Sequence, residues 1–269
     1  MKIASVEPIA IEIPFDHGGT PFGWGGQAWT RLSIVLVRVE TDEGIVGWGE
    51  AFSYACRSAV HAAVRDMIAP VVVGSDARDI AGINRRLQRD LHLQGRYGIT
   101  IFAISGLDIA LWDIAGKAAG KPLCELLGGA PRDRIPGYAS LYRYRDPEIV
   151  AERARAARAE GYPFIKLHEI AEREVAAARD AVGEGVPLMV DTNCPWTPAE
   201  ARRRARELAP YDIYWLEEPI FPPEDFDSLA RLQVDTGIPI AAGENACTAF
   251  EFQKMLAAGA VTYAQPSVT

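Results

Sequence analysis

The chain has 269 residues, of which 49% are hydrophobic and 24% charged, and its formal net charge is −8. This composition is typical of a folded globular protein and disfavours disorder. The acidic balance offers no basic face to nucleic acid, no run of about 18 apolar residues could cross a bilayer, and the N-terminus alternates where a signal peptide would be continuously apolar. We therefore expect a cytoplasmic protein without nucleic-acid or membrane partners.

The four cysteines lie far apart and show no CxxC spacing, so the sequence predicts neither a zinc site nor a disulfide framework. Cys194 is the one to watch, because it follows a predicted metal ligand by three residues. Packing in a loop is the favoured interpretation of this thiol.

The N-terminal part of the chain reads as an α+β domain. Residues 3–14 alternate between polar and apolar side chains, and residues 31–40 and 45–48 form a predicted hairpin around the turn at 42–44. Residues 58–119 then show helical periodicity. We place this domain at residues 1–130.

Residues 131–269 alternate short β-rich runs with charged amphipathic segments, which is typical of βα units. The strands are expected at 135–141, 163–168, 187–191, 213–217, 239–244 and 261–266, with helices between them that include 147–159 and 198–208. A closed TIM-type (β/α) barrel has eight units, so these six predict an incomplete barrel of the α/β class. Either the barrel is shortened, or, as we expect, the last two strands belong to a longer protein.

Acidic residues follow three neighbouring strands of this predicted barrel. Asp191, Glu217 and Glu244 each end an apolar run, PLMVD, IYWLE and PIAAGE. Because the carboxyl ends of barrel strands meet at one mouth, the three carboxylates should converge and repel one another unless a hard dication neutralises them. The sequence therefore predicts a Mg²⁺ site, with Mn²⁺ as the alternative metal. Capping of the following helices is the competing interpretation.

Lys166 and His168 alternate on the preceding strand, so their side chains share a face. A buried lysine beside a dication and a histidine near neutral pH can both move protons. We predict that they are the catalytic acid and base, although a structural role is the usual one for a single histidine. A metal-bound carboxylate next to such a base favours removal of the proton α to the carboxylate.

Other polar residues are predicted to support this site. Asn193 and Asn245 should orient ligands or substrate by hydrogen bonding, and Glu218 should form a salt bridge behind the site. Arg143 and Arg145, just after the first barrel strand, are the nearest candidates to grip distal groups of the substrate.

The segment GLDIALWDIAGKAAGKPLCELLGG (residues 106–129) and the motifs VDTN, WLEEP and GEN resemble the mandelate racemase and muconate lactonizing enzyme branch of the enolase superfamily. The resemblance covers nearly the whole chain. It implies an N-terminal capping domain on a barrel, Mg²⁺ on the three carboxylates, a small carboxylate substrate and a homo-oligomer, either a dimer or an octamer. It also implies that residues 17–29, including Trp24, contact substrate; a surface loop is the alternative.

The chain departs from this family pattern at two points. Where many relatives have Lys-x-Lys, it has Lys166, Leu167 and His168, and Ser267 stands where racemases carry an aspartate. Because racemisation needs a competent base on each face of the substrate, we favour a lyase that dehydrates a hydroxy acid such as a sugar acid. The alternatives are a racemase, epimerase or cycloisomerase, or a truncated barrel that binds metal without turnover.

Overall fold

A computed structural model describes residues 1–19 and 29–269. Trp24, predicted to contact substrate, lies outside the described residues. The described chain divides into two compact units, one of residues 1–16, 29–133 and 268–269 and the other of residues 17–19 and 134–267.

The first unit contains an antiparallel sheet in the order β1-β2-β3. Its strands are β1 (Ile3–Pro14), β2 (Arg31–Thr41) and β3 (Val46–Ala51). The predicted hairpin is confirmed, with Val39 of β2 paired to Gly47 of β3 across a turn in which Gly44 has φ of +80°. This positive φ suits glycine, which lacks the Cβ that makes left-handed backbone costly.

Helices follow the sheet where the helical periodicity predicts them. They are α1 (Arg57–Ala62), a π-helical turn η2 (Ala63–Ile68), α2 (Ala69–Val72), α3 (Ile80–Asp90), a 3₁₀ turn η3 (His92–Gln94), α4 (Ile99–Ala119) and α5 (Leu123–Leu126). The apolar residues of α1, η2, α2, α3 and α4 share one buried core with Val35, Val37 and Val39 of β2.

Helix α4 lies unusually close to β3 because glycines line both surfaces. A Cβ on Gly49 would lie 2.0 Å from the carbonyl oxygen of Gly106, and one on Gly47 would lie 2.2 Å from that of Ala110. The helix is long and apolar enough, with mean hydropathy 1.6, to resemble a membrane span. Its buried residues, such as Leu107 and Leu111, pack into the core of this unit instead.

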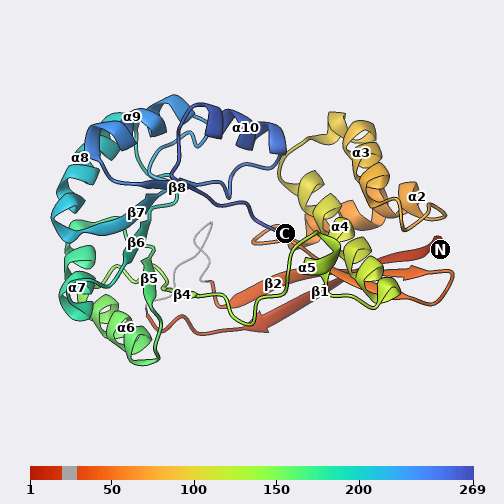
Figure 1. Cartoon of the computed structure of the whole chain (residues 1–269), viewed down its shortest axis with the longest axis horizontal. Helices are drawn as coiled ribbons and strands as arrows, with labels where there is room; N and C mark the ends of the chain where they lie inside the picture. The colour runs from red at the N-terminus through yellow and green to blue at the C-terminus, as the bar shows by residue number, and fades with distance from the viewer. Residues whose placement is uncertain (20–28) are drawn as a thin grey trace. The chain divides into compact units, whose positions relative to one another are not determined.

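The second unit contains a six-stranded parallel sheet in the sequential order β4 to β9. Its strands are β4 (Tyr138–Ser140), β5 (Phe164–Leu167), β6 (Leu188–Asp191), β7 (Ile213–Glu217), β8 (Ile240–Ala242) and β9 (Tyr263–Ala264). Its helices are α6 (Pro147–Ala159), α7 (Glu172–Val182), α8 (Pro198–Leu208), a 3₁₀ turn η4 (Ala209–Tyr211), α9 (Phe226–Thr236) and α10 (Ala249–Ala257). Figure 1 shows the strands along a curve with these helices on its outer side. The incomplete (β/α) barrel is confirmed.

Local sequence explains where the barrel helices begin. Asp146 accepts hydrogen bonds from the backbone at the start of α6, and Thr197 and Glu200 form a capping box at the start of α8. Each helix starts with proline, whose fixed φ suits the first turn. Their alanine and valine faces pack on the buried side of the strands, which leaves the other side of the sheet for polar groups.

Candidate active site

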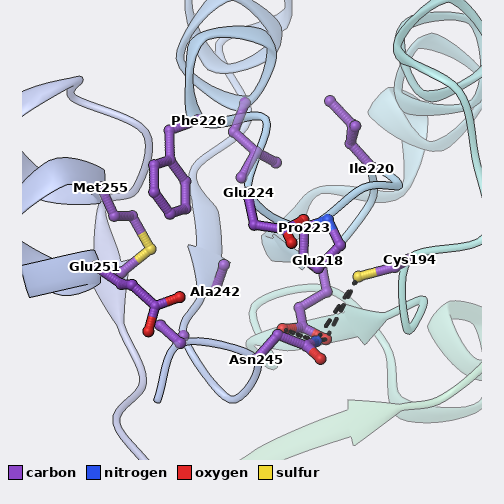
Figure 2. Close-up of a pocket in the computed structure, with 13 residues that line it drawn as sticks. Cys194, Glu218, Ile220, Pro223, Glu224, Phe226, Ala242, Asn245, Glu251 and Met255 are labelled. Carbon is purple, nitrogen blue, oxygen red and sulfur yellow. Dashed lines mark hydrogen bonds between the residues drawn. The ribbon is translucent and has the colours of Figure 1, made fainter. Parts of the chain in front are cut away.

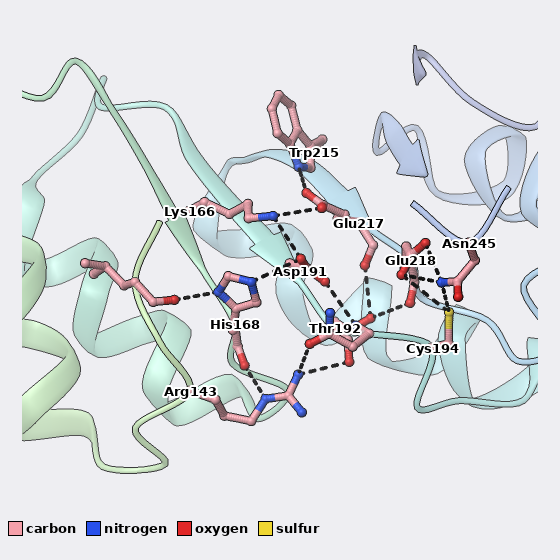
Figure 3. A network of polar contacts seen from close by, with 12 residues as sticks. Arg143, Lys166, His168, Asp191, Thr192, Cys194, Trp215, Glu217, Glu218 and Asn245 are labelled. Atoms are coloured by element: carbon pink, nitrogen blue, oxygen red, sulfur yellow. Dashed lines mark hydrogen bonds and ion pairs between the residues drawn. The ribbon is translucent and has the colours of Figure 1, made fainter. Parts of the chain in front are cut away.

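A buried lysine joins two of the predicted metal ligands at the carboxyl ends of β5, β6 and β7. Nζ of Lys166 lies 2.9 Å from Oδ2 of Asp191 and 2.8 Å from Oε1 of Glu217 (Figure 3). The sheet register places Asp191 directly beside Glu217. Each of the three side chains is less than a tenth exposed. The structure thus brings together a cation and two carboxylates that the sequence predicted to meet.

His168 lies on the same side of this cluster as Lys166. Its Nε2 is 3.3 Å from Oδ2 of Asp191, and its Nδ1 is 2.5 Å from the carbonyl oxygen of Leu141. Both catalytic candidates therefore touch one carboxylate, and the imidazole is held at both ring nitrogens.

Charge coupling dominates the ionisation of this cluster. Burial by itself lowers the pKa of Lys166, but the negative charges of Asp191 and Glu217 outweigh it and raise that pKa above its usual range. Burial would raise the pKa of Asp191, yet the hydrogen bond from His168 and the charge of Lys166 hold it well below its usual range. The side chains alone therefore keep Lys166 protonated and Asp191 ionised.

Glu244 follows β8 and is exposed, unlike the other two predicted ligands. Lost hydration at each carboxyl group and the charge of Asp191 raise the pKa of both Glu217 and Glu244, so Asp191 repels each of these two carboxylates. In the part of the chain described, no three His, Cys, Asp or Glu side chains are arranged to hold a metal ion as they stand. The three-ligand site therefore stays a prediction.

The donor set nevertheless fits a hard dication. Asp191, Glu217 and Glu244 offer only oxygen ligands, which Mg²⁺ prefers. The ammonium of Lys166 already lies between Asp191 and Glu217, so the two carboxylates stabilise a positive charge at this position.

Glu218 lines a small pocket together with apolar residues that include Ile220, Phe226 and Met255 (Figure 2). Its carboxylate accepts hydrogen bonds from Nδ2 of Asn245 at 2.9 and 3.0 Å and from the thiol of Cys194 at 3.7 Å. The salt bridge expected of Glu218 is not formed with any residue described. The neutral amide of Asn245 bonds to its carboxylate instead. Burial and the charge of Glu244 raise the pKa of Glu218 to about 8.

Cys194 is part of this arrangement, because its thiol bonds to the carboxylate of Glu218. Burial and the charge of Glu218 raise the pKa of its thiol far above the usual range. A thiol held protonated is a poor nucleophile.

The backbone is strained just after the ends of β6 and β7. Asn193, Cys194 and Glu218 have φ of +54°, +53° and +45°, a region that residues with a Cβ rarely adopt. Such strain is maintained only where surrounding contacts require it, and it concentrates at functional sites. Asn193 also donates its backbone N–H to Oδ1 of Asp191 at 3.1 Å, so it lies beside the predicted ligand as expected.

Sequence reasoning missed three supporting contacts. Trp215 donates its indole N–H to Oε2 of Glu217 at 2.9 Å, and the hydroxyl of Thr192 donates to the backbone carbonyls of Glu217 and Glu218. Arg143, which the sequence predicted to grip distal groups of the substrate, donates to the carbonyl oxygens of His168 and Thr192 and to Oδ1 of Asn193. The spacing of Trp215 two residues before Glu217, on the same face of β7, is the one signal that could have found it.

Comparisons with known proteins agree with this architecture. Residues 17–128 match the mandelate racemase / muconate lactonizing enzyme N-terminal domain, and residues 149–269 match the enolase C-terminal domain-like family. The chain is 36% identical to a D-galactarolactone cycloisomerase of Agrobacterium fabrum, covering 100% of this chain and 71% of the relative. It is 35% identical to a D-galactonate dehydratase of Ralstonia nicotianae, covering 87% of this chain and 64% of that one.

Solved structures show the same likeness. A racemase from Streptomyces coelicolor with bound magnesium superposes with a TM-score of 0.91 at 33% identity, covering 99% of this chain and 76% of that one. A 3,6-anhydro-D-galactonate cycloisomerase from Zobellia galactanivorans gives 0.87 at 30% identity, covering 100% and 72%. The chain is therefore an enzyme homologue that belongs to the mandelate racemase and muconate lactonizing enzyme branch of the enolase superfamily.

Proposed function

We propose that this chain removes the proton α to the carboxylate of a hydroxylated acid and then expels the β-hydroxyl group, which is dehydration of a sugar acid. The observation that carries the proposal is the contact of both Lys166 and His168 with the carboxylate of Asp191. Two proton-carrying groups thus meet at a cluster of oxygen ligands. Relatives named as dehydratases of D-galactonate and arabinonate support the reaction class.

The reaction balances as follows. A base takes the α-proton, the electron pair of the C–H bond forms a C=C bond, and the β-hydroxyl leaves as water after accepting a proton from an acid. The enol that remains tautomerises to a 2-keto acid. Nε2 of His168 and Nζ of Lys166 are the two candidates to move these protons, one as the base and the other as the acid.

Asp191, Glu217 and Glu244 are the residues that would hold Mg²⁺ or Mn²⁺. A dication bound by them would supply positive charge to stabilise the enediolate formed when the α-proton leaves. Asn193 and Asn245 would keep the surrounding loops in place, since they bond to Asp191 and Glu218.

Cycloisomerisation is the second candidate. Relatives that act on D-galactarolactone and 3,6-anhydro-alpha-L-galactonate carry that name, and such a reaction can share the first step, loss of an α-proton. A racemase or epimerase is less favoured, because it needs a base on each face of the substrate, whereas His168 and Lys166 lie against the same carboxylate.

The test is NMR of a hydroxy-acid library incubated with the protein and Mg²⁺ in D₂O. Formation of a 2-keto acid with release of water supports the dehydratase, and an isomeric product with α-deuterium supports the cycloisomerase. Deuterium uptake with every hydroxyl retained would favour the racemase or epimerase. Metal binding with no exchange in any acid would favour a chain that binds metal without turnover.

Two variants connect this chemistry to the cluster. Glu217→Gln should weaken Mg²⁺ binding in calorimetry and abolish α-proton exchange, whereas Lys166→Met should retain Mg²⁺ binding and lose formation of the 2-keto acid. Glu184→Gln, an exposed carboxylate on the loop after α7, is the matched control and should change neither. Exchange that persisted in Glu217→Gln, or a 2-keto acid formed by Lys166→Met, would contradict the proposed site.

We also propose a cytoplasmic location and a homo-oligomer, either a dimer or an octamer. The acidic composition is compatible with the location, and the family resemblance supports the assembly. Light scattering coupled to size-exclusion chromatography measures the assembly directly, and a monomer at micromolar concentration would contradict it.

A further inference from the structure

Arg143 lies in the loop between β4 and α6 and reaches across the ends of the next two strands. Its Nε donates to the backbone carbonyl of His168, and its Nη2 donates to the carbonyl of Thr192 at 3.1 Å and to Oδ1 of Asn193 at 2.9 Å (Figure 3). A planar guanidinium suits acceptors spread over two strands, whereas an ammonium is a single point of charge.

The same loop also holds the ring of His168. The backbone N–H of Leu141 donates to the carbonyl of Lys166 at 2.8 Å, and the carbonyl of Leu141 lies 2.5 Å from Nδ1 of His168. Because a carbonyl can only accept, Nδ1 must carry a proton in either charge state. Nε2 is then the nitrogen left facing Asp191 and the predicted site of chemistry.

Glu169, which follows His168, bonds back to the loop between β4 and α6. Its buried Oε1 accepts the backbone N–H of Tyr144 at 2.6 Å and that of Arg145 at 3.2 Å. Residues 141–145 and 168–169 are therefore tied to each other by bonds that run both ways. We call the hydrogen bonds between residues 141–145 and residues 166–169 the clasp.

We propose that Arg143 is a positioning residue, which through the clasp sets the orientation of the His168 imidazole and keeps Nε2 directed at the substrate. The proposal rests on the proposed function, in which His168 moves a proton. It differs from the interpretation that the sequence first favours, in which Arg143 grips distal groups of the substrate. Nε and Nη2 already donate to His168, Thr192 and Asn193, so among the described residues' contacts Nη1 is the guanidinium nitrogen left for such a grip.

The first experiment observes the clasp without any substrate. The chain has four histidines, so ¹⁵N-histidine labelling gives few ring signals, and loss of a signal in His168→Gln assigns the Nδ1–H of His168. In the wild type we expect this proton to exchange slowly with water, because Leu141 accepts it. Arg143→Met should speed its exchange at least tenfold or broaden the signal beyond detection. Arg155→Met, an exposed arginine on α6, is the matched control and should leave it unchanged.

The second experiment separates positioning from binding. With an acid that the wild type turns over, Arg143→Met should lower kcat about 10- to 100-fold while KM stays within about twofold, as is usual when a group that orients a functional residue is lost. Arg143→Lys should recover part of kcat, because one ammonium can bond to some of the acceptors. A large rise in KM with kcat retained would overturn the proposal in favour of a substrate grip.

The two experiments keep the hypotheses distinguishable. If no acid is turned over, the proposed function fails, but the exchange of the His168 Nδ1–H still reports on the clasp. If turnover is found and Arg143→Met changes neither that exchange nor kcat, the positioning role is wrong while the function stands. Should Arg143→Met fail to fold, judged by circular dichroism, Arg143→Lys provides the same comparisons, with smaller effects expected.

Discussion

At the scale of single residues, the centre of the second unit depends on a lysine that balances two buried carboxylates. The side chain of Lys166 is buried, and the side chains of both its partners, Asp191 and Glu217, are nearly fully buried. Removing one member of a buried ion pair is costly because the others remain charged without compensation. The sequence predicted a buried lysine near carboxylates, but not that one ammonium would bridge two of them.

Lys166→Met should therefore lower the free energy of unfolding by about 3–5 kcal/mol in metal-free buffer near pH 7. Urea denaturation followed by circular dichroism measures this change. Lys254→Met, an exposed lysine on α10, is the control and should change stability little. A loss for Lys166→Met no larger than that of the control would show that the bridge contributes nothing to stability.

Glu169 gives a prediction for the dependence of stability on pH. Burial, followed by the charge of nearby Glu174, raises the pKa of Glu169 above its ordinary value despite the two backbone N–H groups that it accepts. The folded protein thus holds the carboxyl proton of Glu169 more tightly than the unfolded chain does. The protonated carboxyl group therefore contributes to folding stability below the unfolded pKa, and this contribution is lost as pH rises through the folded pKa.

Glu169→Gln keeps an acceptor oxygen but cannot ionise, so it should remove that loss. Relative to the wild type, the variant should gain stability as pH rises from about 4 toward 7, starting from the unfolded carboxylate pKa near 4.3. Denaturant midpoints at several pH values test this. A difference between the two proteins that is constant over pH would show that Glu169 does not titrate across this range.

At the scale of elements, the first unit depends on close contact between α4 and β3. A Cβ on Gly49 would overlap backbone atoms of Gly106 and Ala110, which cannot move without shifting the helix, and one on Gly106 would lie 2.8 Å from side-chain atoms of the sheet. Sequence periodicity predicted both elements. The need for glycine at these positions follows only from the distance between them.

Gly49→Ala should destabilise the first unit by at least about 1–3 kcal/mol, the usual cost of overpacking, because its Cβ would lie 2.0 Å from a carbonyl oxygen. Thermal unfolding measures the loss. Gly137→Ala is the control, since no heavy atom lies within 4 Å of the Cβ it adds. An unchanged midpoint for Gly49→Ala would mean that α4 and β3 are further apart than described.

At the scale of the whole molecule, the buried residues form two separate hydrophobic clusters. One contains residues such as Val37 and Leu107 of the first unit, and the other contains residues such as Leu188 and Leu216 of the barrel unit. A unit with its own core can unfold as its own cooperative step.

We therefore expect two calorimetric transitions. Gly49→Ala should lower only the midpoint of the first unit. Mg²⁺ should raise the midpoint of the barrel unit, because a ligand stabilises the unit that binds it, and Glu217→Gln should abolish this rise. A single transition shifted by both Gly49→Ala and Mg²⁺ would show that the two cores unfold together.

The sequence by itself determined the order and type of the elements. The predicted limits of 3–14, 147–159, 198–208 and 213–217 coincide with β1, α6, α8 and β7, because burial imposes periods of two and 3.6 residues and capping residues mark helix starts. The regular spacing of Asp191, Glu217 and Glu244 also identified the candidate site, since parallel strands present their carboxyl ends at one edge.

Only the tertiary structure decided which polar atoms pair across the strands. That Lys166 bridges Asp191 and Glu217, that Glu218 bonds to Asn245 and not to a cation, and that Arg143 bonds to the strand ends are all contacts between residues far apart in the chain. Their partners depend on strand register, on rotamers and on which atoms are left unsatisfied when the helices bury the other face of the sheet. Local patterning sets where a polar side chain stands, whereas the need to satisfy every buried polar group sets what it touches.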